Sequence, residues 1–199
     1  MKWAVSRGAR GFSLFELVIV VVLISLLLTV AIDRLLLFKA QAERTAMEQV
    51  LGNLRSGITI RLAEMAVRGK LGDADKLAGS NPMGLLAVRP ENYLGEFFGP
   101  DPASLDPGNW YYDSRDGALC YLVESADYFD TVLPPPARAR FRIRPVFDDT
   151  DGDGRYDPKV DALRGMQLAP LEPYGWNLRF VWPDWPWREP AKAPSAARR

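Results

Sequence analysis

Residues 11–32, GFSLFELVIVVVLISLLLTVAI, determine how the rest of this chain can be arranged. Between Phe12 and Ile32 the only charged residue is Glu16. The run matches the roughly 20 apolar residues that a helix needs to cross the hydrocarbon core of a bilayer. Before it, the chain carries three basic residues and no acidic one: Lys2, Arg7 and Arg10. Because cations before a first span keep the N-terminus cytoplasmic, the sequence predicts one span with the remaining chain on the other side.

Glu16 is the residue that an ordinary membrane anchor does not explain. A carboxylate within an apolar span costs about 3 kcal/mol unless it is paired, protonated or close to the interface. Such residues are therefore functional candidates, and a buried charge persists where an opposite charge accompanies it. The sequence predicts that Glu16 has a partner.

The order of a basic leader, Gly11, the residues FSLFE at 12–16 and an apolar run resembles the class III signal of type IV pilins and type II secretion pseudopilins. In that family a prepilin peptidase cleaves after the glycine and methylates the new N-terminus. The resemblance implies cleavage between Gly11 and Phe12, with N-methylated Phe12 as the mature terminus. It also implies that Glu16, then the fifth residue, pairs with the terminal amine of a neighbouring subunit.

Two other interpretations of the same stretch compete with a filament subunit. An ordinary secretory signal would use residues 29–31, Thr-Val-Ala, as its small-residue cleavage site. The apolar run is long for such a signal, which also gives Glu16 no role. A plain single-pass anchor explains the run but neither Gly11 nor Glu16. We therefore favour the filament subunit.

Composition bounds the remaining possibilities. The chain has 199 residues, enough for one long helix and one modest domain. Lysine plus arginine and aspartate plus glutamate both total 25, so no basic excess suggests nucleic-acid binding. Histidine is absent, which excludes His-based triads and His metal sites. Cys120 is the only cysteine, which excludes an intramolecular disulfide and favours a small buried residue. No constellation of catalytic groups appears, and we expect no enzyme.

The helix is predicted to continue well beyond the apolar run. No proline occurs between Phe12 and Val67, so we expect one helix of about 55 residues, or about 80 Å at 1.5 Å per residue. Glycines at 69 and 72 provide a C-cap. Charged residues such as Glu43 are expected mostly on the outer sides. Apolar residues at steps of three or four form the docking stripe: Leu37, Met47, Val50, Leu51, Leu54, Ile58, Leu62 and Met65.

An α+β fold follows, in which the long N-terminal helix packs on a small antiparallel sheet. Aromatic and β-branched residues at 110–112 and 118–123 flank an Asp-Gly turn and predict a hairpin. Residues 138–147 and 176–182 alternate charged and apolar side chains and predict two more strands. Pro145 places its strand at an edge or a bulge. Before the hairpin, a short helix is possible at 90–98.

The acidic stretch at residues 148–161, DDTDGDGRYDPKVD, predicts a calcium-binding loop. Its alternating aspartates and following glycine match the first half of an EF-hand-like loop, in which hard oxygens surround a hard cation. Position twelve is Val160 rather than glutamate, and the aspartate that could complete the site comes one residue later. A solvated acidic turn is the alternative interpretation. The candidate ligands are Asp149, Asp151, Asp153, the Arg155 carbonyl, Asp157 and Asp161.

These expectations define a minor pilin or pseudopilin in the bacterial inner membrane, with its C-terminal domain in the periplasm before it joins a filament. The resemblance implies prepilin peptidase, other subunits and an inner-membrane assembly platform as partners. The alternative is a calcium-binding, membrane-anchored adhesin that does not polymerise. The expected segments are a leader at 1–11, a filament-core helix at 12–34, its amphipathic continuation at 35–69, a connecting segment at 70–108, a sheet domain at 109–183 and a flexible tail at 184–199.

Overall fold

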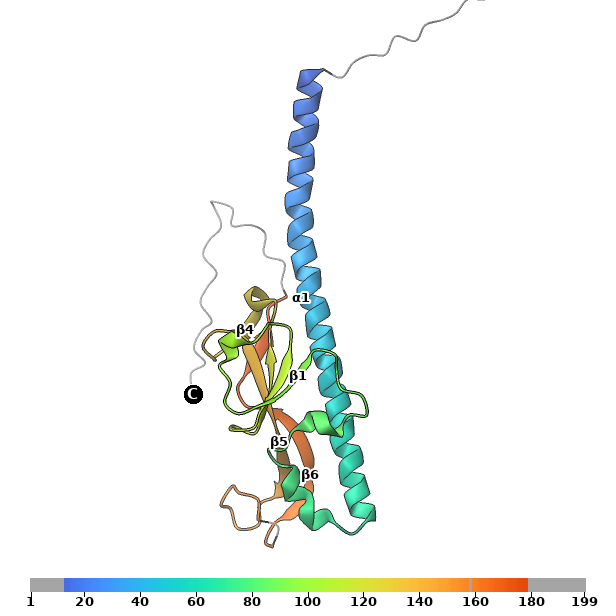
Figure 1. Cartoon of the computed structure of the whole chain (residues 1–199), viewed down its shortest axis with the longest axis vertical. Coiled ribbons are helices and arrows are strands. Elements are labelled where there is room, and N and C mark those ends of the chain that lie inside the picture. The colour runs from blue at the N-terminus through green and yellow to red at the C-terminus, as the bar shows by residue number, and fades with distance from the viewer. Residues whose placement is uncertain (1–12, 158, 179–199) are drawn as a thin grey trace, which may run out of the picture. The chain divides into compact units, whose positions relative to one another are not determined.

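The computed structural model describes residues 13–157 and 159–178, and it divides them into two compact units (Figure 1). The first unit comprises the described residues up to Phe38, all but the first of which are helical. The second begins at Lys39 and contains the rest of the helix and every described strand.

Helix α1 runs from Leu14 to Val67, 54 residues that contain no proline. The predicted long helix is therefore confirmed, and it ends two residues before the expected boundary at 69. Gly69 adopts a φ of 66°, and its N–H donates to the Ala66 carbonyl at 3.1 Å. The next N–H, of Lys70, donates to the Met65 carbonyl at 2.8 Å. These two bonds form a Schellman cap, which satisfies carbonyls that the end of a helix leaves open.

The second unit is built on a five-stranded sheet in the order β1-β2-β3-β5-β6. Strands β1 and β2 are parallel, and the other neighbouring pairs are antiparallel. A two-stranded antiparallel sheet, β4 with β7, accompanies it. The strand bounds are β1 Tyr93–Phe97, β2 Trp110–Asp113, β3 Ala118–Leu122, β4 Phe129–Thr131, β5 Arg138–Asp148, β6 Ala162–Pro170 and β7 Tyr174–Trp176.

The core lies between α1 and one face of this sheet. Met47, Leu51, Leu54 and Ile58 are each at most 1% exposed, and their steps of four, three and four residues place them on one side of the helix. Full burial of such a side chain contributes about 1.5–3 kcal/mol. The predicted stripe therefore docks the helix. The buried residues of the five-stranded sheet in the same cluster are Trp110, Tyr112, Leu119, Tyr121, Ala139, Phe141, Ile143 and Leu168.

The predicted short helix at 90–98 is wrong, because this segment forms strand β1. Gly95 has a φ of 117°, outside the helical region, and Tyr93 is in register with Trp110 of β2. Backbone hydrogen bonding to a strand that is distant in the sequence outweighs local helix propensity here. The sheet is consequently mixed, and the expectation of a purely antiparallel sheet is corrected.

Of the other strand predictions, the hairpin and the position of Pro145 are confirmed, and the last strand is confirmed only at Trp176. The hairpin is confirmed as β2 and β3, which close at the Asp113–Ala118 pair. Pro145 lies in β5 next to a bulge between Val146 and Phe147, as predicted from its missing N–H. Strand β6 was not anticipated. Of the predicted strand at 176–182, only Trp176 belongs to a strand, and residues 179–182 lie outside the described part of the chain.

Four short 3-10 helices connect these elements: η1 Leu71–Leu77, η2 Pro82–Leu85, η3 Pro102–Ser104 and η4 Ala126–Tyr128. Helix η2 approaches α1 closely at Gly57. A Cβ added to Gly57 would lie 3.3 Å from the carbonyl oxygen of Leu85, whereas a Cβ at Gly52 would meet nothing within 4 Å. The two helical glycines therefore have different roles, and only Gly57 is required by packing.

This difference is testable by alanine substitution. Gly52→Ala should stabilise the full chain in detergent by about 1 kcal/mol, because alanine loses less backbone entropy in a helix. Gly57→Ala has the same intrinsic gain but must displace the Leu85 backbone, so we expect it to be less stable than Gly52→Ala by about 1 kcal/mol. Chemical denaturation measures both variants. Equal gains would contradict a packing role for Gly57.

Candidate functional site

The predicted cleavage and methylation positions, Gly11 and Phe12, lie outside the described residues. The first described residue is Ser13, which caps helix α1. The Ser13 hydroxyl oxygen accepts the N–H of Glu16 at 3.1 Å, and the Ser13 carbonyl accepts the N–H of Leu17 at 3.1 Å. A serine at the N-cap followed by glutamate three positions later is a favourable helix start. The sequence around Glu16 therefore also fixes where the helix begins.

Glu16 lies on the first turn of α1 with its side chain exposed. It forms no ion pair with any residue that the structure describes. A carboxylate at a helix N-terminus is favoured by the helix dipole, but this does not replace a counter-charge in lipid. The partner predicted for Glu16 is thus not supplied by the described part of the same chain.

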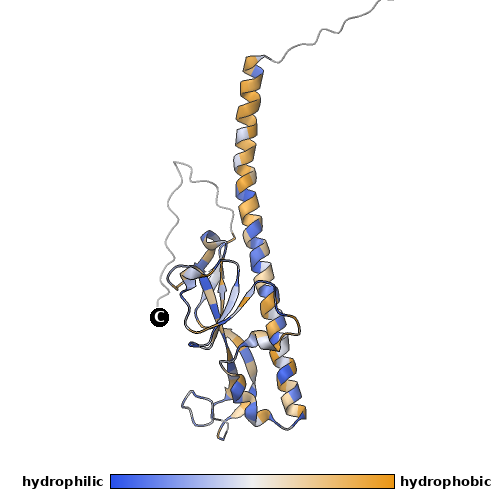
Figure 2. Cartoon of the chain, viewed as in Figure 1, coloured by the Kyte–Doolittle hydropathy of each residue, from blue (hydrophilic) through white to orange (hydrophobic). Residues whose placement is uncertain are grey.

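The first unit presents an almost entirely apolar surface (Figure 2). Within the described residues, α1 is the one helix long and apolar enough to cross a membrane, and none of its apolar window is buried. The hydroxyls of Ser25 and Thr29 donate to the carbonyls of Val21 and Ser25 one turn earlier, which satisfies them without water. The large apolar residues, each at least 41% exposed, are Leu14, Phe15, Leu17, Val18, Ile19, Val21, Val22, Leu23, Ile24, Leu26, Leu27, Leu28, Val30, Ile32, Leu35, Leu36 and Phe38.

The acidic loop connects β5 to β6 and brings three of the predicted ligands together. Oxygen atoms of Asp149, Asp151 and Asp153 lie within 4.8 Å of one another, and all three side chains are exposed. Glycines with positive φ make the tight loop possible, at 77° for Gly152 and 74° for Gly154. Their N–H groups donate to the Asp149 carboxylate at 2.7 and 2.9 Å. The loop therefore gathers carboxylate oxygens, which are the ligand type that hard cations such as calcium prefer.

Another predicted ligand, Asp161, holds the loop closed. Asp161 is only 7% exposed, and its oxygens accept the N–H groups of Thr150 at 3.0 Å and Asp157 at 2.8 Å. These bonds join the start of the loop to its end. Arg155 donates its N–H to Asp153 at 2.7 Å. The structure thus separates a cluster of three carboxylates from a structural aspartate, a distinction that the spacing of the aspartates does not reveal.

Electrostatics within the cluster oppose its full ionisation. The N–H of Asp153 donates to Asp151 at 3.3 Å and by itself lowers the pKa of that carboxyl. Desolvation and repulsion from the neighbouring carboxylates outweigh this bond, so the pKa of Asp151 is raised. A divalent cation between the carboxylates would remove that repulsion.

Sequence reasoning missed the residues that fasten α1 to the sheet. Glu43, expected among the outward charges, is half-buried and accepts three hydrogen bonds. Its donors are the Tyr121 hydroxyl at 3.0 Å and the N–H groups of Glu124 at 2.7 Å and Ser125 at 2.8 Å. Lys39 pairs with Glu124 at 2.7 Å beside them. Burial, followed by the Glu43 charge, raises the pKa of Tyr121, so its hydroxyl remains a donor at neutral pH.

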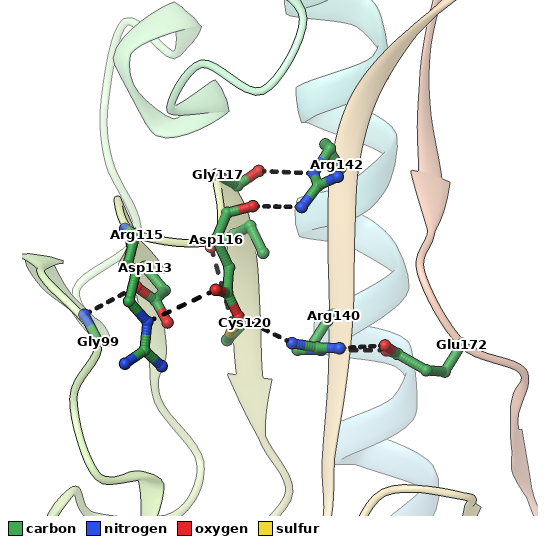
Figure 3. A network of polar contacts seen from close by, with 10 residues as sticks. Gly99, Asp113, Arg115, Asp116, Gly117, Cys120, Arg140, Arg142 and Glu172 are labelled. Atoms are coloured by element: carbon green, nitrogen blue, oxygen red, sulfur yellow. Dashed lines mark hydrogen bonds and ion pairs between the residues drawn. The ribbon is translucent and has the colours of Figure 1, made fainter.

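A second polar network secures the β2–β3 turn on the opposite face of the sheet (Figure 3). Arg140 of β5 bridges Asp116 at 3.2 Å and Glu172, which follows β6. Asp113 accepts the N–H groups of Gly99 at 2.9 Å and Arg115 at 3.0 Å. The alternation of arginines along β5 was visible in the sequence, but their acidic partners come from turns that only the fold brings near. We assign this network a structural role.

The family model described as the prokaryotic N-terminal methylation motif matches residues 6–32 of the chain. The match spans the predicted cleavage position, Glu16 and the apolar run. Comparison with curated proteins gives no match, and neither does comparison with solved structures. The sequence relationship therefore rests on the N-terminal segment.

The Glu43 contacts allow a direct test of what holds the helix on the sheet. Glu43→Ala leaves three donors without their acceptor and should destabilise the full chain in detergent by about 2–3 kcal/mol. Glu48→Ala is the matched control, because it removes an exposed helix-surface pair with Arg44, worth about 0.5 kcal/mol or less. Urea denaturation of both variants measures the difference. Similar losses would show that the Glu43 contacts do not contribute.

Proposed function

We propose that this chain, which carries the class III prepilin signal of type IV pilins and pseudopilins, is a minor pilin or pseudopilin. It would be a structural subunit of a type IV pilus or type II secretion pseudopilus, processed after Gly11 by prepilin peptidase. The observation that carries the proposal is the methylation motif at residues 6–32, which leads into a helix with an uncovered apolar surface. The motif marks proteins that work as assembly subunits rather than as catalysts, and we propose no enzymatic activity.

The first unit supports two successive environments for the same helix. In the inner membrane, lipid would cover its apolar surface, and the C-terminal domain would lie in the periplasm. In a filament, the corresponding helices of neighbouring subunits would cover it, because close packing between apolar helices replaces contacts with lipid. An assembly platform in the inner membrane would transfer the subunit from one environment to the other.

Glu16 has its proposed role in this transfer. Its carboxylate lacks an ion-pair partner among the described residues, and cleavage after Gly11 would create a charged N-methylated amine at Phe12. In a filament the amine of one subunit would neutralise Glu16 of the next. Such a pair stabilises the assembled state because removing either partner leaves a charge in apolar surroundings.

Two features support a minor pilin or pseudopilin over a major pilus subunit. Cys120 is the only cysteine and is 1% exposed, so no disulfide closes a C-terminal loop. Helix α1 contains no proline that would loosen it in a filament. Many major pilins have such a disulfide and such a proline, and this chain has neither.

Mass spectrometry and Glu16→Ala together test this function. The chain extracted from host membranes should begin at N-methylated Phe12. Glu16→Ala should still insert in the membrane and fold, but its incorporation into filaments should fall about tenfold or more, the effect of losing a buried charge pair. Glu48→Ala, an exposed change on the same helix, should assemble normally.

Each contrary result would support a different interpretation of this chain. An uncut Met1 would indicate a simple membrane anchor, and a start at Ile32 would indicate a secreted domain. Normal incorporation of Glu16→Ala would remove the pairing argument. Processing at Phe12 without any filament incorporation would favour the alternative of a membrane-anchored adhesin that does not polymerise.

We further propose that the acidic loop binds calcium. The supporting observation is the gathering of Asp149, Asp151 and Asp153 oxygens within 4.8 Å, on a loop that Asp161 holds closed. Asp157 and the Arg155 carbonyl would complete an oxygen-only ligand set of the kind that calcium prefers. Calcium would supply the positive charge that the cluster lacks and would stabilise the loop against unfolding.

Thermal melting with and without calcium tests this proposal. A ligand at 100 times its Kd stabilises the folded state by about 2.7 kcal/mol, so millimolar calcium should raise the melting temperature of the full chain. Because the pKa of Asp151 is raised in the folded chain, ionisation of this carboxyl opposes folding. The stability that its protonated form contributes is present below the ordinary pKa of 3.8 and is lost as pH rises through the folded pKa. Asp151→Asn should therefore melt slightly higher in chelator at pH 7 and lose the response to calcium. If calcium did not change the melting temperature of the wild-type chain, the loop would be a solvated acidic turn and the calcium proposal would be wrong.

A further inference from the structure

A basic hollow lies between the C-terminal turns of α1 and helix η1, all within the second unit. Its volume is about 260 Å³, and its lining includes four cations and one carboxylate. Met65, which is 9% exposed, contributes apolar lining. The charged lining residues are Arg61, Arg68, Lys70, Lys76 and Asp73.

Only part of this positive charge is balanced within the described chain. Arg61 pairs with Glu64 at 3.1 Å, and Lys76 pairs with Asp73 at 2.6 Å. Arg68 and Lys70 form no ion pair with any described residue. A concave site with two cations outside any described ion pair favours a carboxylate-bearing partner that protrudes far enough to enter it.

The acidic loop at residues 148–161 provides such a protrusion. It contains six aspartates against one arginine and one lysine, a net charge of −4, and one bound calcium ion would still leave it at −2. Two of its aspartates are already committed, since Asp148 pairs with Arg164 at 2.7 Å and Asp161 is buried in loop-closing bonds. The carboxylates at 149, 151 and 153 are exposed, and they accept N–H groups of their own loop.

In one copy the acidic loop is close enough to η1 for the Asp75 charge to act on Tyr156, but no described ion pair joins the loop to the hollow. Figure 1 shows the β5–β6 loop and the C-terminal end of α1 on different sides of the same end of the second unit. Complementary patches on different sides of one molecule make heterologous contacts, in which one copy presents one patch and the second copy presents the other.

We propose that the basic hollow around Arg68 and Lys70 receives the acidic β5–β6 loop of a second copy of this chain. The contact rests on the proposed function, because a filament would place globular domains side by side. It would act between domains, in addition to the packing of the N-terminal helices. Opposite charges would select the partner and its register more than they would raise the overall affinity.

Cross-linking of mixed isotopes tests the contact in the full chain. Copies labelled with ¹⁴N and ¹⁵N are co-expressed, and membranes or filaments are treated with a carbodiimide, which joins a lysine amine to a carboxylate with no spacer. Hybrid peptides linking Lys70 to Asp149, Asp151 or Asp153 are expected, and their yield should fall at high salt because exposed charges are screened. Links within one isotope only would place the contact inside a single chain and overturn the proposal. Links from Lys70 to another protein would also overturn it.

Charge reversal provides an independent test of the same contact. Arg68→Glu with Lys70→Glu, or Asp151→Lys with Asp153→Lys, should each lower pairing between copies about tenfold, because attractive contacts become repulsive. Mixing the two reversed chains should restore hybrid links between positions 70 and 151 or 153. Arg89→Glu, at an exposed cation away from the hollow, is the control and should change nothing. Failure of the mixture to restore links would overturn the proposal.

The two proposals fail separately in these experiments. Reversal in the second unit leaves residues 6–32 intact, so N-methylated Phe12 should persist in every variant. Processing at Phe12 and loss of assembly in Glu16→Ala, without hybrid links at Lys70, would refute the contact and leave the subunit function standing. An unprocessed N-terminus would refute the function itself.

Discussion

The exclusion of water from one apolar helix surface is the constraint on which this protein depends. After the first turn, residues up to Phe38 satisfy their backbone hydrogen bonds within the helix, and even Ser25 and Thr29 bond to carbonyls of their own helix. The apolar window of this segment is nevertheless left uncovered in the first unit. Only lipid or other helices can cover such a surface, so the free energy that keeps this unit in place comes from its surroundings. A membrane-anchored subunit that joins a filament meets this requirement twice, with the same residues.

The second unit solves the opposite problem, because it must hold its part of α1 on a sheet in water. The apolar stripe from Met47 to Ile58 supplies most of the burial, and such contacts do not by themselves fix the position of a helix along its axis. Glu43 adds direction, since a carboxylate that accepts two adjacent N–H groups and a tyrosine hydroxyl has one favourable position. Apolar packing thus provides attachment, and directional hydrogen bonds provide register.

Charge is distributed in the second unit as separated patches of opposite sign. The acidic loop concentrates carboxylates at a cost shown by the raised pKa of Asp151, and the hollow beside η1 holds cations that the described chain does not pair. Both patches gain from a partner of opposite charge, either a cation in the loop or another copy of the chain. The two proposals are compatible in net charge, because one calcium ion would leave the loop negative.

The sequence by itself determined the long helix, the methylation motif, the apolar stripe and the β2–β3 hairpin. Each depends on residues close together in the chain: periodicity from Met47 to Ile58, a capping glycine at 69, an Asp-Gly turn. Only the tertiary structure decided that residues 93–97 form a parallel edge strand and that β6 completes the sheet. It also decided that Glu43 accepts the hydrogen bonds that hold α1 on the sheet. It also separated Asp161 from the carboxylate cluster. These features depend on hydrogen bonds between groups distant in the sequence, whose free energy outweighs local propensity only once the fold brings them together.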